Sequence, residues 1–213
     1  MTSWLHEQRL AAVLAALRDC RAKSILDLGC GDGALLSRLA GDPAIERIVG
    51  VDLSAESLAR LRTDLGRLPG GQGNTVALIH GSLTGLGSDL AGFDAAVLVE
   101  VIEHIDPDRL STVARAVFGD LAPATVVVTT PNSEFNALLG VPAHRFRHPD
   151  HRFEWGRAKF RAWAEGVAGR HGYDSAVSDI GVHPTLGGPT QMAIFTRRAE
   201  NGKREVASPP HGL

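Results

Sequence analysis

Ile25-Leu-Asp-Leu-Gly-Cys-Gly-Asp-Gly33 is the segment that decides the fold of this 213-residue chain. It begins as a short apolar run and ends in alternating glycines, after which an apolar helical pattern starts at Ala34. This order predicts a strand, a tight turn and a helix whose positive N-terminus faces a ligand. A second apolar run at residues 47–51 makes the segment the first part of a β-α-β unit.

The same alternation continues along the chain. Strands are predicted at residues 24–28, 47–51, 76–80, 94–99, 124–130, 173–179 and 191–196, and helices at 5–20, 34–40, 55–65, 108–121 and 156–170. Continuous apolar strands indicate a parallel sheet that is buried on both faces. We therefore predict one doubly wound α/β domain over residues 1–198 and a disordered tail over 199–213. The first helix is interpreted as packing only.

Composition excludes several classes of protein. Hydrophobic residues make up 44% of the chain and charged residues 22%, which is typical of a globular protein. A formal charge of −2 argues against a generally basic nucleic-acid binder. The apolar runs are shorter than the ~20 residues of a membrane helix, the first twenty residues lack signal-peptide features, and the two cysteines indicate reduced thiols. A cytoplasmic protein without a membrane partner is expected.

The glycine spacing favours one nucleotide-like ligand over another. Asp27 precedes a G-x-G-x-G pattern, whereas nicotinamide sites use G-x-G-x-x-G. Asp52 ends the second strand, where a carboxylate can accept two ribose hydroxyls. The combination resembles the class I S-adenosylmethionine-dependent methyltransferases. The resemblance implies S-adenosylmethionine as cofactor, bound by Asp27, Gly29, Gly31, Asp52, Leu53, Ser82 and Leu83. For Ser82, an ordinary loop after a strand is the alternative.

A possible metal site follows the fourth predicted strand. Glu100, Glu103 and His104 share one face if the chain turns helical there. Acidic residues also favour a solvated helix start, but the carboxyl end of a central strand is where open α/β sheets bind ligands. The irregular segment 131–155 adds His148 and His151, and spacing alone does not choose between them.

Three motifs together resemble one family. E-x-x-E-H at 100–104, T-P-N-x-E-F-N at 130–136 and D-H-R-F-E-W at 150–155 resemble the Hua-enhancer family of RNA 3′-terminal ribose 2′-O-methyltransferases, over about residues 26–173. The resemblance implies a metal held by Glu100, Glu103, His104 and His151, and an RNA 3′ end as substrate. His148 precedes the third motif and is not covered by the resemblance. It or a ligand imidazole is the candidate proton acceptor, so the predicted catalytic residues are Glu100, Glu103, His104, His148 and His151.

The implied ligand set fits particular metals. Two carboxylates and two imidazoles suit Mn²⁺, Fe²⁺, Co²⁺ or Zn²⁺ better than Mg²⁺, and we expect Mn²⁺ first, with Mg²⁺, Co²⁺ or Fe²⁺ as alternatives. Four protein ligands on an octahedral ion leave two adjacent positions open, which match the 2′,3′ cis-diol of a terminal ribose. An internal nucleotide lacks this diol because its 3′ oxygen is esterified. The Lewis acidity of the ion would activate the 2′-OH for in-line attack on the methyl group.

A basic stretch predicts where RNA binds. Residues 144–161 contain six Lys or Arg and two acidic residues, which is typical of a local phosphate-binding surface, although a solvated helix face is the alternative. Phe146 is available to stack on a terminal base, whereas Phe153 and Trp155 are expected in the core. The predicted RNA-binding residues are Asn132, Arg145, Arg147 and Arg152, with a turn as the alternative role for Asn132.

Two other functions compete with this interpretation. One is a metal-dependent O-methyltransferase that acts on a small-molecule vicinal diol, and the other is a non-catalytic RNA-end binding module. The resemblance leaves open whether the substrate is a small silencing RNA or a broken transfer RNA, and whether an RNA repair kinase and ligase are partners.

Overall fold

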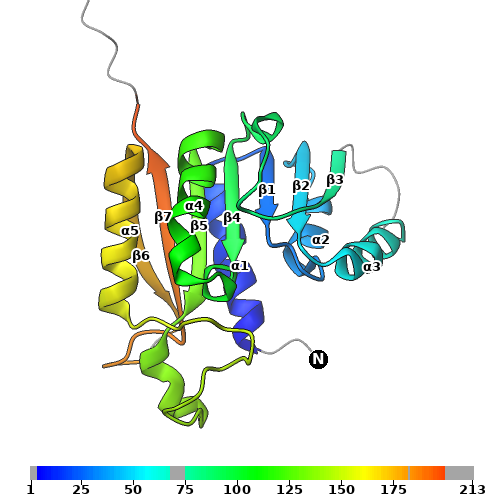
Figure 1. Ribbon diagram of the computed structural model, residues 1–213. Coiled ribbons are helices and arrows are strands. Elements are labelled where there is room, and N and C mark those ends of the chain that lie inside the picture. The colour runs from blue at the N-terminus through cyan, green and yellow to red at the C-terminus, as the bar shows by residue number, and fades with distance from the viewer. Residues whose placement is uncertain (1–3, 68–74, 182, 200–213) are drawn as a thin grey trace, which may run out of the picture.

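The computed structural model describes residues 4–67, 75–181 and 183–199 of the chain. Its centre is a seven-stranded sheet (Figure 1). The strands are β1 (Ser24–Leu28), β2 (Arg47–Asp52), β3 (Thr75–His80), β4 (Ala95–Val99), β5 (Thr125–Pro131), β6 (Tyr173–Ile180) and β7 (Thr190–Arg197). The α-helices are α1 (Trp4–Asp19), α2 (Ala34–Ala40), α3 (Ala55–Leu65), α4 (Leu110–Ala114) and α5 (Arg157–His171). Short 3₁₀ helices are η1 (Ser88–Leu90), η2 (Ile102–His104), η3 (Pro107–Arg109) and η5 (Ser133–Leu139), and η4 (Arg115–Leu121) is a π-helix.

The strand order confirms the predicted doubly wound architecture. It runs β3-β2-β1-β4-β5-β7-β6, and the first five strands pair in parallel. β7 pairs antiparallel with both β5 and β6. The order reverses between β1 and β4, and in open α/β sheets ligands bind outside the carboxyl ends of the strands at such a point.

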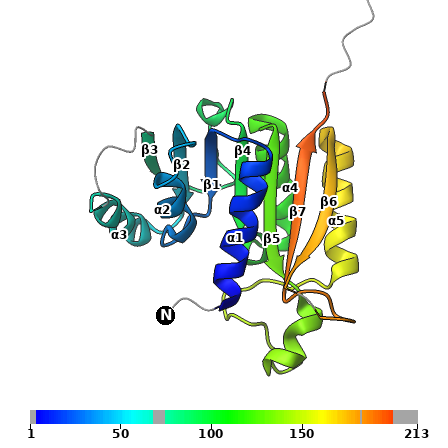
Figure 2. The ribbon, with the colours of Figure 1, turned by 180° about the vertical axis from the view of Figure 1, so that it is seen from behind.

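A hydrophobic core fills each face of the sheet, which explains why the strand sequences are continuously apolar. In β1, Leu26 belongs to the core beneath α4 and α5, whereas its neighbour Ile25 belongs to the core beneath α1 and α2. Figure 2 shows α1 crossing the second of these faces. Among the described residues, no helix has the length and apolar character needed to span a membrane.

The structure differs from the sequence prediction in one helix. The helix expected over residues 108–121 is divided into η3, α4 and the π-helix η4. It ends at Ala122, which has a left-handed backbone with φ of 42°. The tail predicted to be disordered falls mainly on residues 200–213, which lie outside the described residues.

Replacing Ala122 by glycine should stabilise the protein. A left-handed backbone costs a non-glycine residue about 1–2 kcal/mol, and the added freedom of glycine in the unfolded chain cancels part of the gain. We expect Ala122→Gly to raise the free energy of unfolding by about 0.5–1 kcal/mol in urea titrations. The matched control, Ala162→Gly on the exposed surface of α5, should lower it by about 1 kcal/mol. Equal destabilisation by both changes would contradict this account.

Candidate active site

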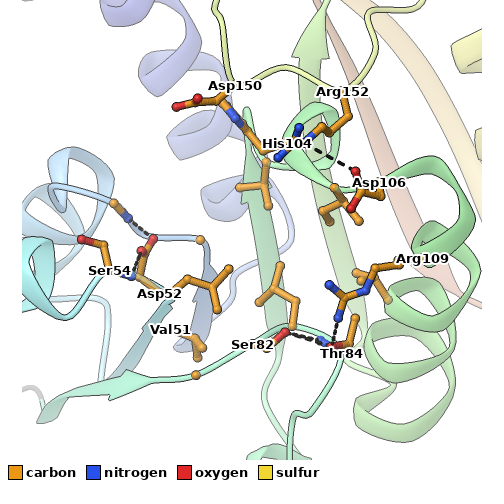
Figure 3. A pocket seen from close by; sticks show the side chains of 18 of the residues that line it. Val51, Asp52, Ser54, Ser82, Thr84, His104, Asp106, Arg109, Asp150 and Arg152 are labelled. Carbon is orange, nitrogen blue, oxygen red and sulfur yellow. Dashed lines mark hydrogen bonds and ion pairs between the residues drawn. The ribbon is translucent and has the colours of Figure 1, made fainter.

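A cavity of about 690 Å³ opens at the carboxyl edge of the parallel strands. Its walls come from the turn after β1, the ends of β2 and β3, the segment after β4, and the irregular segment before α5. In Figure 3, Asp52 and Ser54 lie on one side, and His104, Asp150 and Arg152 lie together at one end. The cavity therefore joins most of the predicted cofactor residues to two of the predicted metal ligands, Glu100 and His104.

The glycine turn is shaped for close approach of a ligand. Gly29 and Gly31 both line the cavity with positive φ values of 85° and 53°. At Gly31 a side chain would enter open space, so the missing Cβ leaves room on the cavity side. The backbone N–H of Gly31 donates to Oδ2 of Asp52 (2.8 Å), and that of Ser54 donates to Oδ1 (2.8 Å). Each oxygen keeps a lone pair, so this carboxylate can accept hydroxyl groups of a ribose.

Asp27 lies beneath this turn and is almost fully buried. Its Oδ2 has no hydrogen-bond partner among the described residues. Burial, with the nearby charge of Asp52, raises the pKa of Asp27 to about 7. A buried acid with a free acceptor atom beside a glycine turn fits a cationic group such as the amino group of S-adenosylmethionine.

The other predicted cofactor residues also line the cavity. Leu53 is 69% exposed, whereas Leu83 is buried in the wall. The hydroxyl group of Ser82 bonds with that of Thr84 (2.9 Å), which in turn accepts from Arg109 (3.0 Å). Figure 3 shows these three polar side chains together at the side of the cavity away from His104.

The chain does not turn helical directly after β4. Glu100 has a left-handed backbone with φ of 56°, and η2 begins only at Ile102. The expectation that Glu100, Glu103 and His104 share one helical face is therefore wrong in its geometry. Glu100 and His104 still line the cavity. The left-handed residue provides the sharp bend that keeps both near the strand end.

Both glutamates have partners from β5. Oε1 of Glu100 accepts from the hydroxyl of Thr129 (3.1 Å), and Oε2 of Glu103 accepts from Thr130 (3.0 Å). Glu103 is fully buried, and its Oε1 has no hydrogen-bond partner among the described residues. Burial and the neighbouring Glu100 raise the pKa of Glu103 well above its usual value. This unpartnered oxygen fits a cationic ligand.

Three histidines gather at the same end of the cavity. The nitrogen atoms of His104, His148 and His151 that can bind a metal lie within 4.8 Å of one another. His151 Nδ1 contacts Oε1 of the buried Glu154 at 2.6 Å. A carboxylate on one ring nitrogen fixes the tautomer so that Nε2 keeps a free lone pair, an arrangement common among metal-binding histidines. The cluster thus contains two of the predicted ligands together with His148.

Arg147 and Asn132 point into the protein. The Arg147 guanidinium donates to the backbone oxygens of Pro189 and Asn132 and to the Asn136 side chain. Asn132 is fully buried, and its amide donates to the oxygens of Leu186 and Gly188 (2.8 and 2.9 Å). The structure therefore corrects the prediction that these two residues contact RNA, because their polar groups hold the surrounding loops together.

The other predicted RNA contacts remain accessible. Arg145 is exposed, and Phe146 beside it is 47% exposed. Arg152 is exposed at the cavity wall, and its Nε lies 3.5 Å from Oδ1 of Asp106. Phe153 and Trp155 are buried and stacked with centroids 4.2 Å apart, as expected of core residues.

Two contributors were missed in the sequence. Arg9 of α1 pairs with Glu100 at 3.0 Å, whereas the helical pattern of α1 predicts packing only and does not indicate this contact. Glu154 lies three residues after His151, and that spacing is a signal that a carboxylate supports the imidazole.

Comparisons with known proteins show which proteins this chain is similar to. Residues 25–124 match the family described as a methyltransferase domain. A mouse (Mus musculus) small RNA 2′-O-methyltransferase is 40% identical over 203 residues, which cover 91% of this chain and 51% of the mouse protein. The chain thus spans about half the length of the curated relatives it matches.

Solved structures extend the comparison. The crystal structure of the methyltransferase domain of bacterial CtHen1-C is similar with a TM-score of 0.82 and 42% identity, over 92% of this chain and all of that domain. A chain in the Pnkp1/Rnl/Hen1 RNA repair complex is similar with a TM-score of 0.68 and 20% identity, over 92% of this chain and 42% of that one, a likeness of fold alone. These matches confirm the predicted class I methyltransferase fold.

Neutralising Asp27 should change how stability depends on pH. Its pKa is about 7 in the folded protein and about 4 when unfolded, so between these values the folded state holds a proton that the unfolded state has lost. Ionisation of Asp27 therefore lowers stability as pH rises from about 4 to 7. Relative to the unmodified protein, Asp27→Asn should gain on the order of 3 kcal/mol between pH 4 and pH 8 in urea unfolding. A difference between Asp27→Asn and the unmodified protein that does not change with pH would contradict the assignment.

Proposed function

The chain belongs to the Hen1 family of small RNA methyltransferases, and on this premise we propose that it transfers a methyl group from S-adenosylmethionine to the 2′-OH of the 3′-terminal nucleotide of RNA. The observation that carries the proposal is one continuous cavity, because its walls include the glycine turn, Asp52 and a member of the histidine cluster. A methyl donor at the glycine turn and a ribose at the histidine cluster would therefore meet inside one cavity.

The chain's own residues suit the methyl donor. Asp27 would accept a hydrogen bond from the amino group of the methyl donor, and Asp52 would accept from the hydroxyls of the donor's ribose. Because Gly31 has no side chain, the protein backbone there could come close to the donor. Leu53, Ser82 and Leu83 would surround the adenine. S-adenosylmethionine supplies an activated methyl group on a sulfonium, so the protein's task is to orient donor and acceptor in line.

We propose that Glu100, Glu103, His104 and His151 hold a divalent metal. The unpartnered oxygen of Glu103 and the free Nε2 of His151 support this set. A metal would supply Lewis acidity and lower the pKa of an alcohol at this end of the cavity. With two imidazole ligands, Mn²⁺ is favoured over Mg²⁺.

His148 would act beside this set. The backbone N–H of Asp150 donates to its Nδ1 (3.2 Å), so the neutral ring carries its proton on Nε2. A nitrogen that bears a proton donates a hydrogen bond and does not ligate a metal. This favours His148 as a group that orients an oxygen of the terminal ribose, rather than as a further ligand or as the proton acceptor considered from the sequence.

The RNA would approach across the exposed part of the irregular segment. Arg145 and Arg152 are available to phosphate groups, and Phe146 is available to stack on an unpaired base. An RNA repair kinase and ligase are partners consistent with an activity at RNA ends, and small RNAs are the substrate class named for the mouse relative.

Methyl transfer should depend on the chemistry of the RNA end. Labelled S-adenosylmethionine would be incubated with matched oligonucleotides ending in a 2′,3′-diol, a 2′-deoxyribose or a 3′-phosphate, with Mn²⁺ or with EDTA. We expect label only on the diol end and only with Mn²⁺, because both ribose oxygens are needed.

Other results would point elsewhere. Equal labelling of the 3′-phosphate end would contradict recognition of the diol. Labelling of a catechol but not of RNA would favour the small-molecule alternative. Salt-sensitive binding of RNA ends without transfer would favour the non-catalytic module.

Removing Arg145 should weaken RNA binding without affecting the methyl donor. Affinity for RNA falls as the salt concentration rises, and loss of one phosphate contact makes the slope of log affinity against log salt concentration less steep by about 1. We therefore expect Arg145→Gln to raise the KM for RNA several-fold, with unchanged kcat and unchanged affinity for S-adenosylmethionine. The control is Arg198→Gln. Arg198 follows β7, which is antiparallel to β5, so it lies at the amino ends of the parallel strands, away from the cavity. Equal KM values for the two variants would contradict a role of Arg145 in RNA binding.

A further inference from the structure

Arg9 forms an ion pair with a proposed metal ligand. Its Nη2 lies 3.0 Å from Oε2 of Glu100 and 3.4 Å from the hydroxyl of Thr190. The two charged side chains are only 15% and 18% exposed, so solvent screens the pair weakly. A guanidinium stays charged at all physiological pH values. Glu100 therefore has a permanent countercharge.

The fold brings Arg9 to this position from the start of the chain. In Figure 2, α1 begins near the carboxyl edge of the parallel strands and runs back across the sheet. Leu10, Val13 and Leu17 are buried against the sheet and fix the helix in place. Residue 9 precedes the segment 25–124 that matches the general methyltransferase family. The general family match therefore does not account for this contact.

Glu100 has two features that call for such a partner. Its backbone is left-handed, a conformation that persists only when surrounding contacts hold it. Its side chain is held at both oxygens, by Thr129 at Oε1 and by Arg9 at Oε2. Glu103, a second carboxylate of the same site, is fully buried nearby. The guanidinium offsets the repulsion that two shielded acids exert on one another.

We propose that Arg9 is a positioning residue that holds the Glu100 carboxylate in place for the divalent cation. The inference rests on the proposed function, because it needs Glu100 to be a ligand. Arg9 acts through Glu100, because Arg9 itself is not among the residues that line the cavity. Hydrogen-bonding partners of ligand carboxylates are worth about 10- to 100-fold in metal affinity. The positive charge of Arg9 also repels a cation. Removing Arg9 should therefore weaken binding of the divalent cation if positioning dominates, and strengthen it if repulsion dominates.

The test measures binding of Mn²⁺ alone to the full chain by titration calorimetry, without methyl donor or RNA. Arg9→Gln keeps a hydrogen-bonding side chain but removes the charge, and we expect it to bind Mn²⁺ at least ten-fold more weakly. Arg9→Lys keeps the charge without the planar guanidinium, and should recover part of the affinity. Arg18→Gln, an exposed change on the same helix, should bind Mn²⁺ like the unmodified protein.

Binding of S-adenosylmethionine distinguishes positioning from general damage. All three variants should bind the methyl donor with unchanged affinity and unfold at temperatures that do not follow their Mn²⁺ affinities. Unchanged or tighter Mn²⁺ binding by folded Arg9→Gln would overturn the inference, as would a parallel loss of methyl-donor affinity. If Arg9→Gln fails to fold, full Mn²⁺ affinity in Arg9→Lys would overturn it. If the unmodified protein binds no Mn²⁺, the metal part of the proposed function fails and this inference fails with it.

Discussion

The candidate site depends on the hydrogen bonds that converge on the carboxylate of Glu154. It is 1% exposed, and it accepts hydrogen bonds from the backbone of Arg147 (2.7 Å) and from the side chain of Asn136 (2.6 Å), while also contacting His151. Three points of the irregular segment are thereby tied to one buried charge, whose loss would leave several polar groups unpaired. Because one of those points is an imidazole of the histidine cluster, the loop's folding and the site's geometry have the same cause.

The site also concentrates features that cost stability. Asp27 and Glu103 are buried acids, each with one oxygen that has no partner in the part of the chain that the structure describes, and Glu100 has a left-handed backbone. Natural proteins break the rules of local consistency mainly at functional sites. The unfavourable burial of these acids would be relieved by cations, a positively charged amino group at Asp27 and a metal at the glutamates. The same features would thus favour the proposed ligands, and they lower the stability of the protein without them.

The sequence predicted the fold closely, because apolar runs and the glycine turn are local signals. The sites of Asp27 and Asp52 follow from their places at strand ends. The histidine cluster needed a family resemblance, since the site brings together residues from two separate segments. What could not be predicted depends on tertiary contacts: Arg9 reaching Glu100 across 91 positions, and Asn132 and Arg147 turning inward to satisfy loop carbonyls. A basic residue in a loop has the same appearance in sequence whether it faces RNA or a buried oxygen.

The position of β7 has a consequence for how the chain becomes active during synthesis. The last strand, β7, lies between β5 and β6. Residues at its start hold the loop of the site: the backbone oxygen of Pro189 accepts from the backbone N–H of Asn132, and the Gln191 side chain donates to the backbone oxygens of Pro131 and Trp155. Until residue 197 has left the ribosome, β5 has an unpaired edge and the histidine-bearing loop lacks these anchors. The glycine turn can form in a nascent chain, but the completed cavity cannot. The cavity is therefore complete only after β7 has emerged and paired with β5.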